Sequence, residues 1–288
     1  MSLIERIKNE NIKPVLYRGL ENERYHAHGS VSKSQLDLVS KCPALFKWVV
    51  LDGNKREQTP AMELGQAVHM AVLEPEKFSK NFVTLPKELF EHPNKRTKEY
   101  RDLKTDFEKT VGEKKVLDQS AWETVASIRD AVMSNKMASS LLNNGEPELS
   151  VFWEDEKTKM PLRCRPDWLR ADGIVVDLKT TTDATLRAFE ASSVRFRYHV
   201  QAALYLDGIE RVLGHKVKQF IFVVCETKPP WHVALYEVAG PVIELGRELY
   251  RRDLATLVRC IETKEWPGLN DDKILQMGLP AWAWNLEE

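Results

Sequence analysis

The sequence is poor in cysteine and has no closely spaced cysteine pair. Its 288 residues contain four cysteines, which are Cys42, Cys164, Cys225 and Cys260. Structural zinc sites take their ligands from closely spaced cysteine and histidine pairs, so this wide spacing argues against a zinc centre. Isolated cysteines are typical of the reducing cytoplasm. We therefore expect a cytoplasmic protein with reduced thiols.

The sequence also lacks a long apolar run and an excess of charge. No segment approaches the ~20 apolar residues that span a bilayer, and residues 1–15 carry charges where a signal peptide would be apolar. Lysine and arginine total 42 and aspartate and glutamate 43, so the net charge is −1. Nucleic acid binding follows local patches of charge rather than totals. We therefore expect no membrane partner, and any DNA-binding surface must be concentrated in one place.

The first half of the chain has mainly helical patterns. Residues 1–30 are polar, and we expect an arm or a peripheral strand there, before a domain at 31–288. Ser32 or Ser34 is a suitable N-cap for a helix that Pro43 should interrupt. Further helices are expected at 61–75, from about Thr97 onward in the basic stretch 84–118, and at 119–142.

The second half alternates strands and helices. Strand-like segments occur at 148–155, 160–169, 173–181, 218–227 and 231–238. RADG at 170–173 predicts a hairpin. Helices are expected at 184–193, 197–214 and 239–264. This order predicts a single α/β domain with a central mixed β-sheet flanked by helices.

Charged residues follow the apolar run GIVV in the segment 173–181. Residues two apart in a strand share a face, so Asp177 and Lys179 point the same way, and Asp167 of the preceding hairpin strand can face Asp177. Facing carboxylates repel unless a cation separates them, and Mg²⁺ or Mn²⁺ does this better than a lysine alone. A metal with a lysine beside it suits phosphodiester hydrolysis. The alternative is a plain Asp–Lys ion pair at a sheet edge.

Three further features favour a site over an ion pair. His69 follows Gly65 by four positions, on one helix face, where the glycine would let another element approach closely. Glu148 opens the strand before Asp167, and Gln201 and Tyr205 share a helix face, where the glutamine could brace Lys179 or touch nucleic acid. The alternatives are a core histidine, an exposed strand-end charge and a polar pair on a half-exposed helix.

In this order the motifs resemble the PD-(D/E)xK nuclease superfamily and, within it, the RecB-like branch. The branch features are S-K-S-Q-L…C-P at 32–43, G-x-x-x-H, PD…D-x-K and Q-x-x-x-Y. More closely, the chain resembles the family of RecE (exonuclease VIII) C-terminal nuclease domains. The matching segments run from about residue 25 to residue 284 and are GSVSKSQLDLV, HMAVLEPEKF, FWEDEKT, RCRPD, VDLKTT, RYHVQAALYLDG and EWP…LPAWA.

The resemblance implies a Mg²⁺-dependent 5′→3′ exodeoxyribonuclease, with Mn²⁺ as a substitute metal. Such an enzyme degrades linear double-stranded DNA from its ends and leaves 3′ single-stranded tails for homologous recombination by strand annealing. The implied partners are a RecT-like single-strand annealing protein and further copies of the chain in a homotetrameric ring. Members of this family can carry a long N-terminal region. This sequence has none before the matching segments, so we expect a compact, stand-alone version, such as one of phage or prophage origin.

The resemblance also implies roles for individual residues. The implied metal ligands are His69, Asp167, Asp177 and the Leu178 backbone carbonyl. Lys179 matches the catalytic lysine, and Gln201 and Tyr205 match the helix motif. Glu148 matches an acidic position that supports the ligands or binds a second metal. Some RecB-like nucleases hold an iron–sulphur cluster, but only Cys260 lies beyond Cys225 here, so no cluster is expected.

Two alternatives stay open within this interpretation. The same core could serve a structure-specific endonuclease, or it could be a catalytically idle DNA-binding recombination module. The presence of Asp167, Asp177 and Lys179 argues against the idle module. The basic residues near the start of the third expected helix are candidate DNA contacts or a solvated surface: Lys95, Arg96, Lys98, Arg101 and Lys104.

Overall fold

The computed structural model describes residues 13–54, 57–271 and 273–279. Residues 1–12 of the expected arm, and most of the LPAWA segment, lie outside this range. The described part of the arm contains β1 (Val15–Tyr17) and α2 (Asn22–Ala27). Among the described residues, no helix combines the length and the apolar character needed to cross a membrane.

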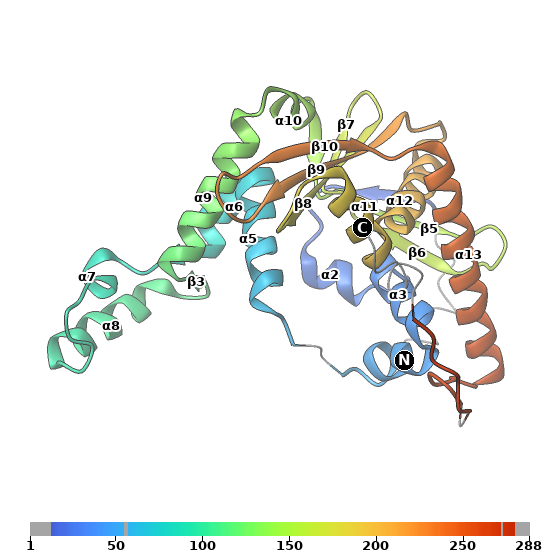
Figure 1. Ribbon diagram of the computed structural model, residues 1–288, viewed down its shortest axis with the longest axis horizontal. Helices are drawn as coiled ribbons and strands as arrows, with labels where there is room; N and C mark the ends of the chain where they lie inside the picture. Colours follow the sequence, from blue (N-terminus) through green and yellow to red (C-terminus); the bar gives the residue numbers. More distant parts are fainter. Residues whose placement is uncertain (1–12, 55–56, 272, 280–288) are drawn as a thin grey trace.

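A mixed five-stranded sheet forms the centre of the molecule (Figure 1). Its strand order is β10-β9-β8-β7-β4, with β8 and β9 parallel and the other neighbours antiparallel. The strands are β4 (Gly145–Pro147), β7 (Trp168–Arg170), β8 (Ile174–Thr181), β9 (Gln219–Glu226) and β10 (Val233–Glu237). The predicted α/β class, with a mixed central sheet and flanking helices, is confirmed.

A second sheet, of order β1-β5-β6, lies beside the first. It contains β5 (Ser150–Glu154) and β6 (Pro161–Cys164). The prediction of one strand over 160–169 is wrong, because β6 and β7 belong to different sheets. Pro166 stands between them and has no N–H to donate to a ladder. The chain therefore changes sheets just before β7, and Asp167 lies at that junction.

The N-terminal helices follow the sequence signals closely. Ser32 and Gln35 form a capping box that starts α3 (Lys33–Lys41), and Pro43 begins the short α4 (Pro43–Phe46). A π-helical turn, η1 (Lys47–Leu51), follows. The next helices are α5 (Pro60–Leu73), which ends before Pro75 as predicted, and α6 (Pro75–Asn81).

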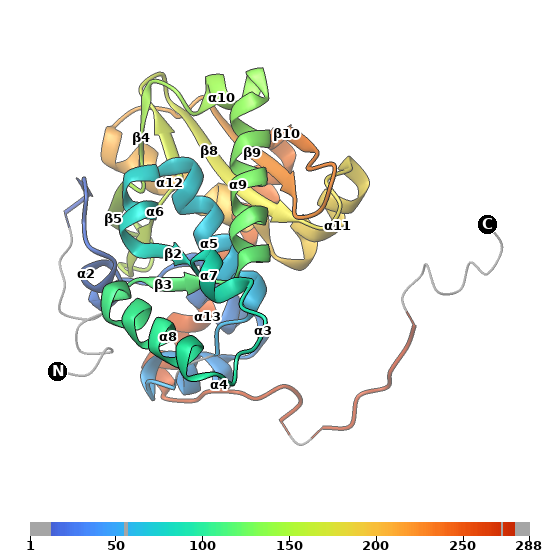
Figure 2. The same cartoon turned by 90° about the vertical axis from the view of Figure 1, so that its left-hand side faces the viewer.

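A long excursion between α6 and α9 projects from the body of the molecule in Figure 1 and faces the viewer in Figure 2. We call it the projecting arm. It carries α7 (Lys87–Phe90) and α8 (Lys98–Val111), and a parallel pair of short strands, β2 (Phe82–Thr84) and β3 (Lys115–Leu117), stands at its base. The expected helix from Thr97 is confirmed, with the Thr97 side chain accepting a hydrogen bond from the Tyr100 N–H at 3.2 Å.

The single helix expected at 119–142 is wrong, because two helices occupy that range. They are α9 (Gln119–Ser134) and α10 (Lys136–Leu141). Asn135 separates them, and its side-chain oxygen accepts hydrogen bonds from the N–H groups of Met137 and Ala138. An asparagine in this role starts a new helix and so ends the earlier one. The other predicted helices are present as α11 (Leu186–Arg195), α12 (Tyr198–Leu213) and α13 (Gly240–Thr263).

Helices cover both faces of the central sheet. One core cluster joins Val176 and Leu178 of β8 to apolar residues of α5 and α9. The other joins Val175 of β8 to apolar residues of α3, α12 and α13. This alternation along β8 is the period of two that a strand buried on both faces must have.

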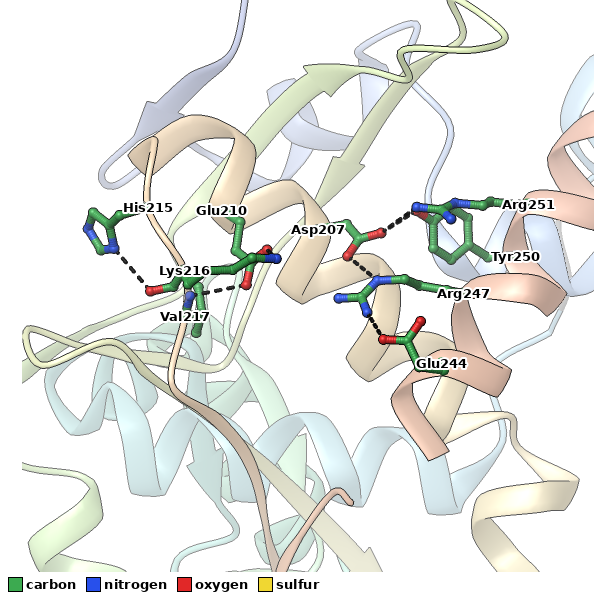
Figure 3. Close-up of polar contacts among 9 residues, drawn as sticks. All are labelled: Asp207, Glu210, His215, Lys216, Val217, Glu244, Arg247, Tyr250 and Arg251. Carbon is green, nitrogen blue, oxygen red and sulfur yellow. Dashed lines mark hydrogen bonds and ion pairs between the residues drawn. The ribbon is translucent and has the colours of Figure 1, made fainter. Parts of the chain in front are cut away.

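Helices α12 and α13 are locked together in two ways. The Asp207 carboxylate of α12 accepts two hydrogen bonds from α13, one from Arg247 at 2.6 Å and one from Tyr250 at 2.5 Å (Figure 3). A Cβ on Gly246 of α13 would lie 2.2 Å from the His199 carbonyl oxygen of α12. This close contact fixes the start of α12, which carries Gln201.

Candidate metal and nuclease site

Three side chains from separate elements meet at the junction of the two sheets. They are His69 of α5, Glu148 between β4 and β5, and Asp167 just before β7, and we call them the triad. One potential ligand atom from each lies within 4.8 Å of the others. His69 Nδ1 is 3.3 Å from Asp167 Oδ2. The Glu148 N–H donates to the Asp167 carbonyl oxygen at 3.1 Å, which ties the two acidic residues together.

A second group stands next to the triad on β8 and α12. The Asp177 carboxylate is fully buried; its Oδ1 contacts the Lys179 ammonium, and its Oδ2 accepts a hydrogen bond from the Gln201 amide. The Leu178 N–H between Asp177 and Lys179 donates to Asp167 Oδ2 at 2.7 Å. The two groups are therefore joined through Asp167.

The electrostatics of these residues reflect crowded negative charge in a buried place. Burial, and then the Asp167 charge, raise the pKa of Glu148 to about 8 and that of Asp177 to about 6. Burial by itself lowers the pKa of Lys179, but the Asp177 and Asp167 charges outweigh it and the net shift is upward. Lys179 is therefore cationic, but its charge, together with those of Arg165 and Lys77 near Glu148, does not offset the burial of the carboxyl groups.

The donor set fits a divalent cation. The triad offers two carboxylates and an imidazole, and hard oxygen donors suit Mg²⁺ and Mn²⁺. Asp177 Oδ1 is buried next to them, and its partner is the Lys179 ammonium. A cation between these groups would offset the burial and the repulsion that together raise the pKa values of Glu148 and Asp177.

The structure groups the expected ligands differently from the sequence resemblance. His69 and Asp167 lie in the triad with Glu148, whereas both carboxylate oxygens of Asp177 are engaged by Lys179 and Gln201. Leu178 contacts the site through its N–H, and the role of its carbonyl stays a prediction. Glu148 is thus better placed as a ligand than as a supporting group.

Gln201 and Tyr205 are both directed inward from α12. Gln201 is only 8% exposed and braces Asp177, not Lys179. Tyr205 packs against Phe220 with ring centroids 6.3 Å apart, and burial raises its pKa well above the usual value. The Gln201 amide therefore belongs to the site directly, while Tyr205 supports the helix behind it.

The expected close approach at Gly65 is not observed. A Cβ built on Gly65 would meet the Thr180 hydroxyl at 3.9 Å, which is ordinary van der Waals contact. A side-chain methyl group therefore fits there, and the position does not require glycine.

Sequence reasoning missed Tyr198, which covers the lysine. Its ring centroid is 4.9 Å from Lys179 Nζ, and the Phe222 centroid is 5.7 Å from the same atom. Aromatic faces attract an ammonium group. Tyr198 precedes Gln201 by three positions on α12, so helical spacing carried a usable signal.

A cavity of about 750 Å³ adjoins the triad. His69 and Glu148 line it, together with the basic residues Arg18, Lys77, Lys115 and Arg165. By contrast, five exposed basic residues lie on the projecting arm, in the segment before α8 and in its first half: Lys95, Arg96, Lys98, Arg101 and Lys104. The basic residues that lie near the triad are therefore not the ones that the sequence suggested as DNA contacts.

The chain matches one protein family and resembles solved structures. A family described as a PDDEXK-like domain of unknown function (DUF3799) matches residues 32–272. The crystal structure of a protein from Eubacterium rectale described as a candidate exonuclease has a TM-score of 0.63 and 12% identity, covering 94% of this chain and 99% of that one. The structure of SSO0001, at 14% identity with 73% and 87% coverage, has a TM-score of only 0.31. No curated protein gives a significant match.

Proposed function

This chain belongs to the family of PDDEXK-like domains, and from that premise we propose that it is a metal-dependent deoxyribonuclease. The observation that carries the proposal is the triad standing directly beside the Asp177–Lys179 pair. A plain ion pair at a sheet edge would not require a further acidic residue with a raised pKa, such as Glu148, or a histidine contributed by a helix, such as His69. The combination supports phosphodiester hydrolysis.

Each residue of the site would have a separate role in hydrolysis. His69, Glu148 and Asp167 would hold the cation, which when bound would polarise a phosphate oxygen and acidify a water. Lys179 is cationic, and its side chain is 15% exposed, so its ammonium can contact the phosphate and stabilise the negative charge that develops there. Asp177 holds that ammonium, and Gln201 fixes the Asp177 carboxylate.

The finer proposal is a Mg²⁺-dependent 5′→3′ exonuclease that acts on linear double-stranded DNA. Support comes from the sequence resemblance to the RecE family and from the likeness in fold to the candidate exonuclease. The 3′ tails would serve recombination with a RecT-like annealing protein in the cytoplasm, and a homotetrameric ring would keep the chain on DNA. A structure-specific endonuclease on the same core is the alternative.

Free DNA ends separate the two candidate functions. The experiment compares linear duplex, labelled at one 5′ or one 3′ end, with covalently closed circular DNA in the presence of Mg²⁺. We expect the linear duplex to lose its 5′ label first and the circle to survive. Cleavage of the circle at a rate equal to that of the linear duplex would favour the endonuclease, and early loss of the 3′ label would reverse the polarity.

A further inference from the structure

An exposed aromatic ring stands beside the candidate site, at the junction of α11 and α12. Phe196 is 49% exposed. Its ring stacks on Tyr198, with centroids 5.7 Å apart and planes inclined by 27°. Tyr198 in turn lies 4.9 Å from Lys179 Nζ. Two stacked rings therefore connect the solvent to the lysine of the candidate site.

The backbone at Phe196 is held firmly. The Lys33 ammonium of α3 donates to the Phe196 carbonyl oxygen at 2.6 Å. The next residue, Arg197, has a positive φ of 56° and binds both Asp37 and the buried Asp253. A non-glycine residue at positive φ is strained, and neighbouring contacts must offset the strain. These contacts fix the position of a ring that leaves half its surface in water.

The surroundings of the ring indicate what it could bind. The Arg195 guanidinium lies 5.3 Å from the Phe196 ring centroid. A half-exposed aromatic ring with a guanidinium over it suits a nucleobase and the phosphate attached to it. A single base needs only one ring for stacking. Bases inside a duplex are stacked on both faces, so a free face is found on an unpaired base or on the terminal base pair.

We infer that Phe196 is a substrate-positioning residue that stacks on an unpaired nucleobase of the DNA and so sets the adjoining phosphate beside Lys179. The inference rests on the proposed nuclease function. It assigns the single-stranded end of a partly opened duplex to the α11–α12 junction.

The test uses a duplex whose short unpaired 5′ end carries 2-aminopurine, a base whose fluorescence falls when it stacks. Binding is measured with Ca²⁺ in place of Mg²⁺, and gels verify that the DNA stays intact. The unaltered protein should quench the probe. Phe196→Leu should abolish the quenching and weaken binding by about 5- to 150-fold, since stacking contributes about 1–3 kcal/mol per base. Phe196→Trp should retain both.

Matched variants make the result specific. Leu186→Ala changes another exposed apolar residue, at the far end of α11 and about 15 Å away at about 1.5 Å per residue, and should leave quenching and affinity unchanged. If Phe196→Leu is also less stable, Phe196→Trp decides, because a stacking role predicts full quenching in that variant. Loss of quenching in Phe196→Trp would then overturn the inference.

Failure of this inference differs from failure of the proposed function. Cleavage of DNA in Mg²⁺ by the unaltered protein, with equal quenching and affinity in Phe196→Leu, would overturn the stacking role and leave the nuclease standing. A protein that neither binds the probe nor cleaves DNA would overturn both.

Discussion

At the scale of single residues, the case for a metal ion is that three buried or half-buried carboxyl groups lie together with few positive charges in contact with them. Glu148, Asp167 and Asp177 lie together, and His69 and Lys179 are the basic side chains in direct contact with Asp167 and Asp177. The pKa values of Glu148 and Asp177, raised to about 8 and about 6, follow from this crowding and from burial. A divalent cation held by the triad would supply the missing charge.

His69→Ala tests the triad at this scale. The variant keeps both carboxylates but removes the nitrogen donor, so we expect Mg²⁺ to bind more weakly and the Mg²⁺ concentration for half-maximal digestion to rise by about 10-fold or more. The measurement is a titration of nuclease activity with Mg²⁺. His232→Ala is a matched control, because His232 pairs with Glu226, outside the triad. An unchanged Mg²⁺ requirement in His69→Ala would remove His69 from the metal site.

At the scale of elements, the sequence predicted most helices and strands because their start and stop signals are local. Ser32, Pro75 and Thr97 act on their own segments, and each acts as expected. The break at Asn135 was missed because an asparagine within an otherwise helical pattern is ambiguous. The split at Pro166 was missed because assignment of β6 and β7 to different sheets depends on distant partners.

The candidate site shows the same division between local and distant information. Spacing along one strand or helix was enough to place Asp177 with Lys179 on one strand face and Gln201 with Tyr205 on one helix face. The proximity of His69 to Glu148 depends on α5 crossing the sheet junction, which no local pattern encodes. Only the family resemblance linked these residues before the structure did.

Gly246→Ala tests the packing that positions α12. The added Cβ would meet the His199 carbonyl at 2.2 Å, so the two helices must separate, and we expect a loss of about 1–3 kcal/mol in the free energy of unfolding. Gly65→Ala is the matched helical control, because space exists there and alanine favours helix by up to about 1 kcal/mol. Thermal melting compares them. Equal melting temperatures for the two variants would contradict the close α12–α13 contact.

At the scale of the whole molecule, the projecting arm is the most distinctive feature outside the site. None of the described side chains of α8 is buried. The arm carries exposed basic residues, including Lys95 and Arg96 in the segment before α8. A surface of this kind can contact DNA beyond the site or a neighbouring copy in the proposed ring. A measurement of molecular mass in solution tests the ring, and a monomer would contradict it.

Charge removal on the arm tests DNA contact. For the double variant Lys95→Gln and Arg96→Gln we expect a smaller salt dependence of duplex binding, with the slope of log K against log salt reduced by about 0.9 for each phosphate that the arm no longer neutralises. Lys157→Gln with Lys216→Gln, in the cavity between α12 and the β5–β6 turn, is the control pair. A slope equal to that of the unaltered protein would show that Lys95 and Arg96 do not contact DNA.

The central claim is that the triad and Lys179 form one nuclease site. Its most direct test is Mg²⁺-dependent digestion of linear duplex by the unaltered protein and by Asp167→Asn, Asp177→Ala and Lys179→Ala, with melting curves to verify folding. We expect the unaltered protein to digest the DNA and each folded variant to lose digestion. Digestion at the unaltered rate by any one of the three would contradict the claim.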